Sequence, residues 1–260
     1  GAWGWVCLVI LVSIGIPYFS IIASSLIKLR GYGLAPGNFT LEHYGELFTT
    51  DKSLRAIGNS LFLAVASALI CSVLGTLVVM AVRKAKGPLK KVLEGISLLP
   101  EMLPAIVLVI GIMLFWNAIY DVLPLYNTMG IMVLAYVVLY VPYTVQYVTS
   151  AFNQINDSLI QAGRTFGGTP LYVFRRVTLP MIGRGILGGA MMIFIIAFRE
   201  LVTASLIAPP NVLVVSTYIN REFEQGSVSL GMAMAVLCVL ITTGALLLMN
   251  GFAERKKAVK

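Results

Sequence analysis

Apolar and polar positions alternate in long blocks along this 260-residue chain. Six apolar blocks approach or exceed the ~20 residues that a helix needs to cross ~30 Å of hydrocarbon. The first block lacks a basic leading segment and a convincing small-residue cleavage site, which favours a span over a signal peptide. The pattern predicts an all-α membrane protein, one transmembrane domain over residues 1–260, with six helices at roughly 3–27, 58–82, 93–116, 129–150, 184–208 and 229–250.

Prolines, glycines and one long polar segment refine this picture. Pro100 and Pro104 lie inside the third block, where we expect a kink. Gly185 and Gly189 form a GxxxG pair, which either allows a neighbouring helix to approach closely or reflects ordinary glycine enrichment in membrane helices. Residues 28–57 are long enough to hold a short amphipathic helix.

The composition excludes several classes of protein. The chain is 58% hydrophobic and 12% charged, against about 25% charged in soluble domains. The three cysteines all lie in apolar runs without a CxxC pair, so neither disulfides nor a cysteine metal site is expected. The only histidine, His43, is expected to be a solvated loop residue.

The net charge of +8 is distributed unevenly along the chain. Thirteen of the nineteen basic residues fall in residues 83–92, residues 151–184 and the C-terminal tail, whereas five fall in the alternate segments. The positive-inside rule then places both termini in the cytoplasm. Nucleic-acid binding is not expected, because the basic residues flank apolar runs instead of forming a patch.

A polar segment, "QAGRTFGGTPLYVFRRVTLP" at residues 161–180, separates the fourth and fifth blocks. Gly167, Gly168, Thr169 and Pro170 interrupt a helical pattern, and a cap near Thr169 with Pro170 in the first turn would start a new helix. We therefore expect two short helices joined by a glycine-rich elbow. Their apolar residues recur at helical spacing: Ile155, Leu159, Ala162 and Phe166 before the elbow, and Leu171, Phe174 and Val177 after it.

This segment resembles a motif of the permease subunits of binding-protein-dependent ABC importers. That motif reads Glu-Ala-Ala, three residues, Gly, nine residues, Ile, one residue, Leu-Pro. Here the same intervals hold Gln161-Ala162-Gly163, Gly167, Val177 and Leu179-Pro180, so the chain departs at Gln161, Gly163 and Val177. The resemblance implies a type I ABC importer permease fold with a cytoplasmic coupling helix in the loop 151–183.

The resemblance also implies a role and a set of partners. It places a contact with the ATPase at Gln161, Ala162, Gly163, Phe166, Gly167, Gly168, Thr169, Pro170 and Leu171; alternatively, the glycines and proline only serve the turn. No phosphate-binding G-x-x-x-x-G-K-[ST] sequence occurs, so ATP and Mg²⁺ would belong to a separate chain. The implied partners are two cytoplasmic ATPases, an extracytoplasmic solute-binding protein and a second permease half that is identical, related or fused. The implied location is a bacterial inner membrane, and no catalytic, cofactor or metal residues are expected in this chain.

Three ionisable residues fall inside the apolar blocks, where such residues are costly and often functional. Glu101 is either a protonated carboxyl that hydrogen-bonds a neighbouring helix or a ligand on the translocation path. Arg199 and Glu200 either pair with other helices or line the path or its gate. Neighbours on a helix point about 100° apart, so these two are not expected to pair with each other.

The phrase "FRELVTASLI" around Arg199 resembles the fifth span of ferric-iron-type permeases, a group with phosphonate, sugar-phosphate and polyamine-like members. This resemblance implies ferric iron or a small anionic, phosphate-like cargo. Many members are fused double permeases, so the chain is expected to be either a second half or a stand-alone subunit. Two other interpretations of the chain are a secondary transporter or channel and a membrane enzyme. A secondary transporter or channel usually has an inverted repeat, and a membrane enzyme needs clustered His, Asp or Glu. Neither feature is visible in the sequence.

Overall fold

The computed structural model describes residues 2–258, apart from the side chains of residues 2, 157 and 252–258. Lys260, one of the basic residues of the C-terminal tail, lies outside this range. Helices form nearly all of the described chain, and a single isolated antiparallel bridge joins Ile27 and Phe39. Residues 1–60 and 211–245 form one compact unit, and residues 61–210 and 246–260 form another.

The first unit contains the helix of the first apolar block. It runs through α1 (Ala2–Ile10), the π-helical turn η1 (Leu11–Gly15) and α2 (Ile16–Leu26). After the short 3₁₀ turn η2 (Arg30–Tyr32), the expected short helix is present as α3 (Glu42–Thr49). The next helix, α4 (Asp51–Lys84), begins earlier than the predicted residue 58 because the polar residues from Asp51 onward already adopt its first turns.

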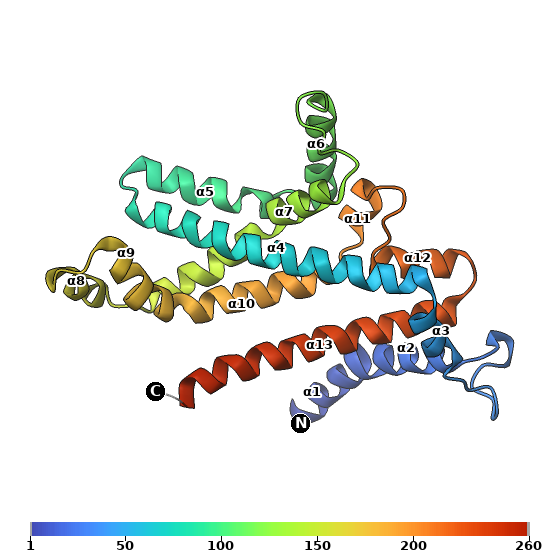
Figure 1. Cartoon of the computed structure of the whole chain (residues 1–260). Coiled ribbons are helices and arrows are strands. Elements are labelled where there is room, and N and C mark those ends of the chain that lie inside the picture. Colours follow the sequence, from blue (N-terminus) through green and yellow to red (C-terminus); the bar gives the residue numbers. More distant parts are fainter. Residues whose placement is uncertain (1, 259–260) are drawn as a thin grey trace. The chain divides into compact units, whose positions relative to one another are not determined.

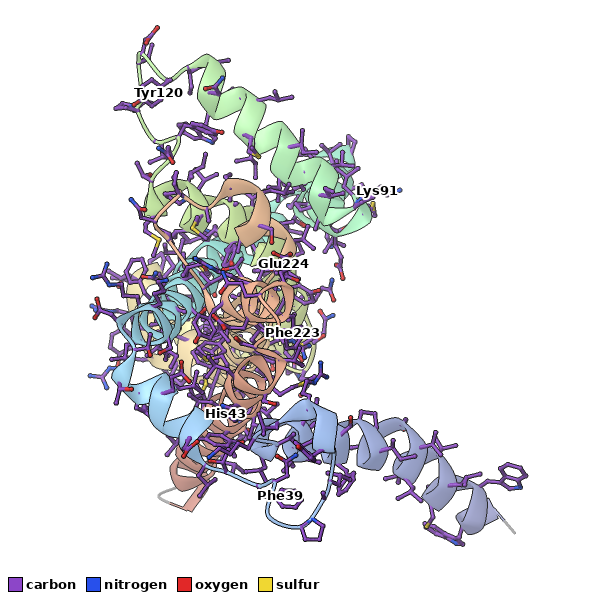
Figure 2. All side chains as sticks on the ribbon, turned by 90° about the vertical axis from the view of Figure 1, so that its right-hand side faces the viewer. Phe39, His43, Lys91, Tyr120, Phe223 and Glu224 are labelled. Atoms are coloured by element: carbon purple, nitrogen blue, oxygen red, sulfur yellow. The ribbon has the colours of Figure 1, made fainter. Side chains whose placement is uncertain are left out.

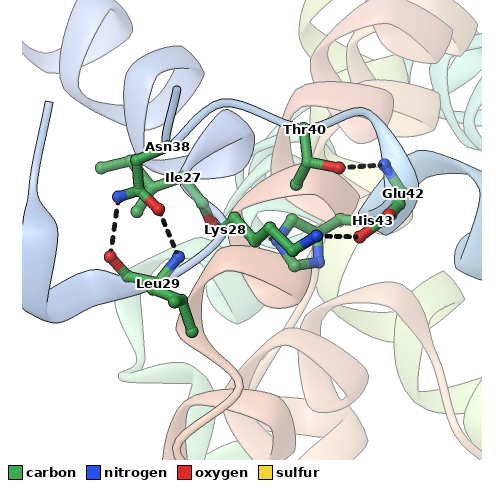
Figure 3. A network of polar contacts seen from close by, with 7 residues as sticks. All are labelled: Ile27, Lys28, Leu29, Asn38, Thr40, Glu42 and His43. Carbon is green, nitrogen blue, oxygen red and sulfur yellow. Dashed lines mark hydrogen bonds and ion pairs between the residues drawn. The ribbon is translucent and has the colours of Figure 1, made fainter. Parts of the chain in front are cut away.

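Polar contacts organise the segment between α2 and α3 (Figure 3). The Asn38 side chain accepts a hydrogen bond from the Leu29 amide at 2.9 Å and donates one to the Leu29 carbonyl at 2.8 Å. His43 is half-buried on α3, with Nε2 3.1 Å from the Ile27 carbonyl. The expectation of a solvated loop histidine is therefore wrong, because Thr40 accepts a hydrogen bond from the Glu42 amide and α3 starts at that point.

The C-terminal part of this unit is a helical hairpin of α12 (Val215–Glu224) and α13 (Val228–Ala258). Figure 2 labels Phe223 and Glu224 at the end of α12. A Cβ atom added to Gly231 would lie 2.6 Å from the Phe223 ring, so the absence of a side chain here lets the ring pack directly on α13. The start of α12 is tied to α4, since the Ser60 hydroxyl accepts a hydrogen bond from the Val215 amide at 2.8 Å.

The second unit is built around α7 (Met129–Asn153), with α10 (Leu179–Phe198) lying along it (Figure 1). Its core draws on three helices, since α4 and α10 both contribute side chains against α7. The buried core residues are Val79, Val145, Val148, Phe152 and Ile182. A hydrogen bond of 3.6 Å from the Cys71 thiol to the Val137 carbonyl adds a polar contact between α4 and α7.

Glycines set the distance between α7 and α10. A Cβ atom on Gly185 would lie 2.6 Å from Ala151 Cβ and 2.7 Å from the Tyr147 carbonyl oxygen, and one on Gly189 would lie 3.0 Å from Thr144 Cα. These distances are too short for a side chain, so the Gly185–Gly189 pair does serve close helix approach. We refer to this contact between α7 and α10 as the glycine seam.

The third apolar block forms two helices instead of one. α5 (Pro88–Met102) and α6 (Ala105–Ala118) meet at a bend of 103°. The chain leaves the helix at Leu103, and Pro104, which has no N–H to donate, precedes the first turn of α6. Pro100 stays inside α5. The expected kink is confirmed at Pro104 but not at Pro100.

The fifth block starts and ends elsewhere than predicted. α9 (Pro170–Val173), the π-helical turn η3 (Phe174–Thr178) and α10 form one continuous 29-residue helix, and α11 (Val202–Ile207) is separate. The predicted bounds 184–208 are therefore wrong at both ends. The wide turn at 174–178 accommodates Pro180, which lacks the N–H of a normal turn, just as η1 precedes Pro17 in the first helix.

By length and composition, five continuous helices in the described part of the chain are apolar enough to span a membrane, and the bent α5–α6 pair makes up to six. They correspond in order to the six predicted blocks. The all-α fold predicted from the sequence is thus confirmed, with the third span broken and the fifth displaced toward the N-terminus.

Candidate functional site

The glycine-rich elbow joins α8 (Asp157–Thr165) to the long helix that starts at Pro170. The Asn156 side chain accepts a hydrogen bond from the Ser158 amide at 3.1 Å and so caps α8. At the other end, Gly167 has φ +80°, a conformation that residues with a Cβ atom rarely adopt. Backbone hydrogen bonds from Gly167 to Arg164 and from Gly168 to Gly163 close the turn.

The start of the long helix follows the sequence prediction. The Thr169 side chain accepts a hydrogen bond from the Tyr172 amide at 3.3 Å, and Pro170 occupies the first turn. The elbow is also packed internally, because a Cβ atom on Gly168 would lie 2.6 Å from the Gly163 carbonyl oxygen. Gly163 in turn faces Val173, so the small residue found where the motif has alanine lets α8 close onto α9.

Large apolar side chains project outward from this compact elbow. Phe166 is 91% exposed and Leu171 is 64% exposed, whereas Val173 behind them is 2% exposed. Gln161 and Ala162 are exposed on α8. Tyr172 is also exposed, although it was not predicted as an elbow residue, because its position one residue past Leu171 belongs to no recognised motif. All nine predicted elbow residues therefore lie within one short helix–turn–helix segment.

Glu101 lies at the last turn of α5, next to the bend. Its carboxylate accepts a hydrogen bond from the Gln146 amide of α7. Both residues are exposed at the surface of the chain. A carboxylate facing hydrocarbon is costly, so a water-filled space or a partner subunit is the natural environment for this pair.

Glu200 lies in the break between α10 and α11. One carboxylate oxygen accepts hydrogen bonds from the Thr203 amide at 2.9 Å and the Thr203 hydroxyl at 3.1 Å. The other accepts a hydrogen bond from the Tyr140 hydroxyl of α7 at 2.7 Å. Glu200 therefore satisfies one free N–H group in the first turn of α11 and ties the break to α7.

Arg199 was expected inside the fifth span, but it is the first residue after α10 and is exposed. Among the residues that the structure describes, it forms no ion pair. The helix ends here because Glu200 turns back to cap α11. The guanidinium group of Arg199 is thus available to a partner or an anion beyond the end of the helix.

The structure does not bring the three intramembrane residues into one site. Glu101 reaches α7 at Gln146 and Glu200 reaches it at Tyr140, positions that lie about 120° apart around the helix. No group of three or more His, Cys, Asp or Glu residues in the described part of the chain could hold a metal ion. The partner residues Gln146, Tyr140 and Thr203 carry no sequence signal, since each is an ordinary polar residue in an apolar run.

Residues 73–258 match the family described as binding-protein-dependent transport system inner membrane component, and the match includes both the elbow and the glycine seam. The chain belongs to this family. It is a multi-pass permease subunit of an ABC importer of the inner membrane, a transport component.

Similar proteins extend the match beyond the family segment. The trehalose transport system permease protein SugB of Mycobacterium tuberculosis is 28% identical over 80% of this chain and 77% of its own length. The Fe(3+)-transport system permease protein FbpB 2 of Haemophilus influenzae is 23% identical over 96% of this chain but only 46% of its own length. A bacterial alginate ABC transporter, solved with a periplasmic protein bound to an alginate pentasaccharide, shares the fold of this permease with a TM-score of 0.78, 17% identity and coverage of 96% and 91%.

Proposed function

We propose that this permease is driven by a separate ATPase that docks on the elbow of residues 161–171. The observation that carries the proposal is the exposure of Phe166 and Leu171 on a turn that is otherwise rigidly packed. Covering the phenyl ring of Phe166, which is 91% exposed, with a partner surface lowers the free energy of the complex. A rigid turn also loses little entropy on binding. Gln161 and Ala162 on α8 would contact the same partner.

Truncating Phe166 tests the docking surface without disturbing the fold. We expect Phe166→Ala to reduce co-purification of the ATPase and to lower solute-stimulated ATP hydrolysis several-fold, while membrane expression stays normal. Phe39→Ala is the matched control, because Phe39 is 52% exposed but belongs to the first unit. Unchanged assembly and hydrolysis in Phe166→Ala would refute the docking role.

Substitutions at Gly167 separate docking from turn formation. No atom lies within 4 Å of a Cβ added to Gly167, so the space is open, but its φ of +80° strains most side chains. Asparagine tolerates this conformation better than tryptophan does. We expect Gly167→Asn to express normally, whereas Gly167→Trp should lose transport. If both variants fail to accumulate in the membrane, the glycine serves only the turn.

The proposed assembly contains two ATPases, a second permease half and an extracytoplasmic binding protein. In it, both termini and the elbow lie on the cytoplasmic side, as the distribution of basic residues indicates. In a variant without native cysteines, Lys86→Cys should react with an impermeant thiol reagent only after the membrane is opened. Val122→Cys, between α6 and α7, should react in intact spheroplasts. The reverse labelling pattern would show that the chain has the opposite orientation in the membrane.

The cargo that we propose is ferric iron or a small anionic, phosphate-like solute. The similar proteins named above transport or bind three different cargoes, so the support for this group of cargoes comes from the phrase "FRELVTASLI". The exposed guanidinium of Arg199 favours the anionic, phosphate-like alternative. Arg199→Lys keeps the charge but loses the planar fork, whereas Arg199→Ala loses both. We expect uptake by the complete system to fall in both variants, more in Arg199→Ala. Wild-type uptake in Arg199→Ala would show that Arg199 has no role in the translocation path. If the system takes up neither radiolabelled iron nor radiolabelled phosphate esters, the proposed cargo is wrong.

A further inference from the structure

A groove opens between the last two turns of α7 and the first turns of α10. It has a volume of about 490 Å³. Gly185 lies in its wall, where the backbones of the two helices nearly touch. The groove contains none of the residues assigned above to the elbow, to Glu101 or to the α10–α11 break, so its lining has no role in the proposed transport cycle.

Polar side chains on both helices face this groove without internal partners. In the described part of the chain, the Arg184 guanidinium, the Ser150 hydroxyl and the Gln154 amide make no hydrogen bond or ion pair, and Arg184 is exposed. No Asp or Glu contributes to the lining. One fixed positive charge with two neutral donors and no opposing carboxylate favours an anion, and a guanidinium group matches a phosphate through two parallel hydrogen bonds.

The remaining lining is apolar and identifies the source of that anion. Ile155 and Met181 line the groove beside the polar groups. Ser150 lies in the last turn of α7, and Gln154 and Ile155 directly follow its end at Asn153. The end of a helix that spans the bilayer is expected near the lipid headgroups. A free phosphate ion would use the polar part only, whereas a phospholipid would also cover Ile155 and Met181.

We propose that this groove binds the headgroup of an anionic phospholipid. The phosphodiester contacts Arg184, Ser150 and Gln154 at the headgroup, and the first methylene groups of an acyl chain lie on Ile155 and Met181. Basic pockets between membrane helices are known to recognise anionic headgroups in this way. Because the groove is formed by both helices, a bound lipid also bridges α7 and α10 at the end of the glycine seam.

The test measures lipid binding to the complete importer purified in a zwitterionic detergent. Native mass spectrometry would record binding of dioctanoyl phosphatidylglycerol, dioctanoyl phosphatidylcholine and inorganic phosphate. We expect phosphatidylglycerol to bind more tightly than phosphatidylcholine, and Arg184→Gln to weaken its binding about tenfold or more. The matched control is Arg176→Gln, which removes an exposed arginine that does not line the groove.

A second variant keeps the proposal testable if Arg184→Gln does not fold. Ser150→Trp fills the groove from an exposed position and leaves the arginine in place, and it should also abolish the bound lipid. Equal binding of the two lipids, or unchanged binding in a folded Arg184→Gln protein, would overturn the proposal. Displacement of phosphatidylglycerol by inorganic phosphate at the same concentration would overturn the assignment to a lipid.

Discussion

The glycine seam and the α5–α6 pair come from similarly apolar stretches of sequence, yet they are buried to very different degrees. α7 contributes eleven buried residues, including Tyr136 and Phe152. In contrast, α5 has no buried residue and α6 has only Val109. Hydrophobicity drives both regions into a membrane, but lipid tails are as apolar as leucine and do not drive helices together. In the glycine seam, Gly185 and Gly189 allow α10 to approach α7 closely.

The largest difference in the loss of unfolding free energy is expected between alanine substitutions of two isoleucines. Ile182, in the core against α7, is 0% exposed, whereas Ile96 on α5 is 61% exposed. We expect Ile182→Ala to lower the free energy of unfolding by about 2–5 kcal/mol, because it leaves a cavity. Ile96→Ala should change it by less than about 0.5 kcal/mol. Denaturant unfolding in detergent micelles measures both, and similar losses would show that α5 is covered within the chain.

The seam itself is tested by adding one methyl group. Gly185→Ala would place Cβ 2.6 Å from Ala151 Cβ and 2.7 Å from a backbone oxygen, so the helices must separate. We expect a loss of about 1–3 kcal/mol. The control Gly183→Ala, two residues earlier on the same helix, meets no atom within 4 Å and should be neutral or slightly stabilising. Equal stability of Gly185→Ala and Gly183→Ala would show that the glycine seam does not depend on the missing side chain of Gly185.

Tyr140→Phe removes the hydrogen bond between α7 and Glu200, which closes the far end of the seam. Hydrogen bonds between membrane helices contribute about 0.6 kcal/mol on average and at most about 1.7 kcal/mol, so the expected loss lies in this range. Tyr143→Phe, on the same helix and without this bond, serves as the control. A thermal melt in which both variants match the wild type would show that Tyr140 does not hold Glu200.

The smallest effect on stability is expected at Glu101, although its effect on transport should be large. Glu101 and Gln146 are exposed, so Glu101→Ala should change the unfolding free energy by less than about 1 kcal/mol. If the pair lines the translocation path, uptake by the reconstituted importer should nevertheless fall several-fold. Normal uptake would leave Glu101 as a simple contact between α5 and α7.

The sequence predicts the elements that depend on local chemistry. The Thr169 cap, the Pro170 start and the Pro104 break all follow from the bonding and shape of single residues, and the structure confirms them. Prediction from the sequence fails where a residue far along the chain determines a contact or the end of a helix. The hydrogen bonds that Gln146 donates to Glu101 and Tyr140 donates to Glu200 cross 45 and 60 residues. The bounds of the fifth span differ from the prediction because the helix that starts at Pro170 continues into α10 and because the chain breaks near Glu200. The orientation of the chain and the role of the elbow remain predictions.

The continuity of the helix from Pro170 to Phe198 has a mechanical consequence. A helix of 29 residues is a rod about 43 Å long, and no loop interrupts it between the elbow and Arg199. Its one irregularity, the wide turn at 174–178, adds a local bulge but leaves the hydrogen-bonded backbone intact. A tilt of only about 5° applied at one end therefore displaces the other by about 4 Å, comparable to the diameter of a methyl group. In the proposed coupling by an ATPase, a small rotation of the elbow would therefore displace the α10 end of this helix by an atomic distance.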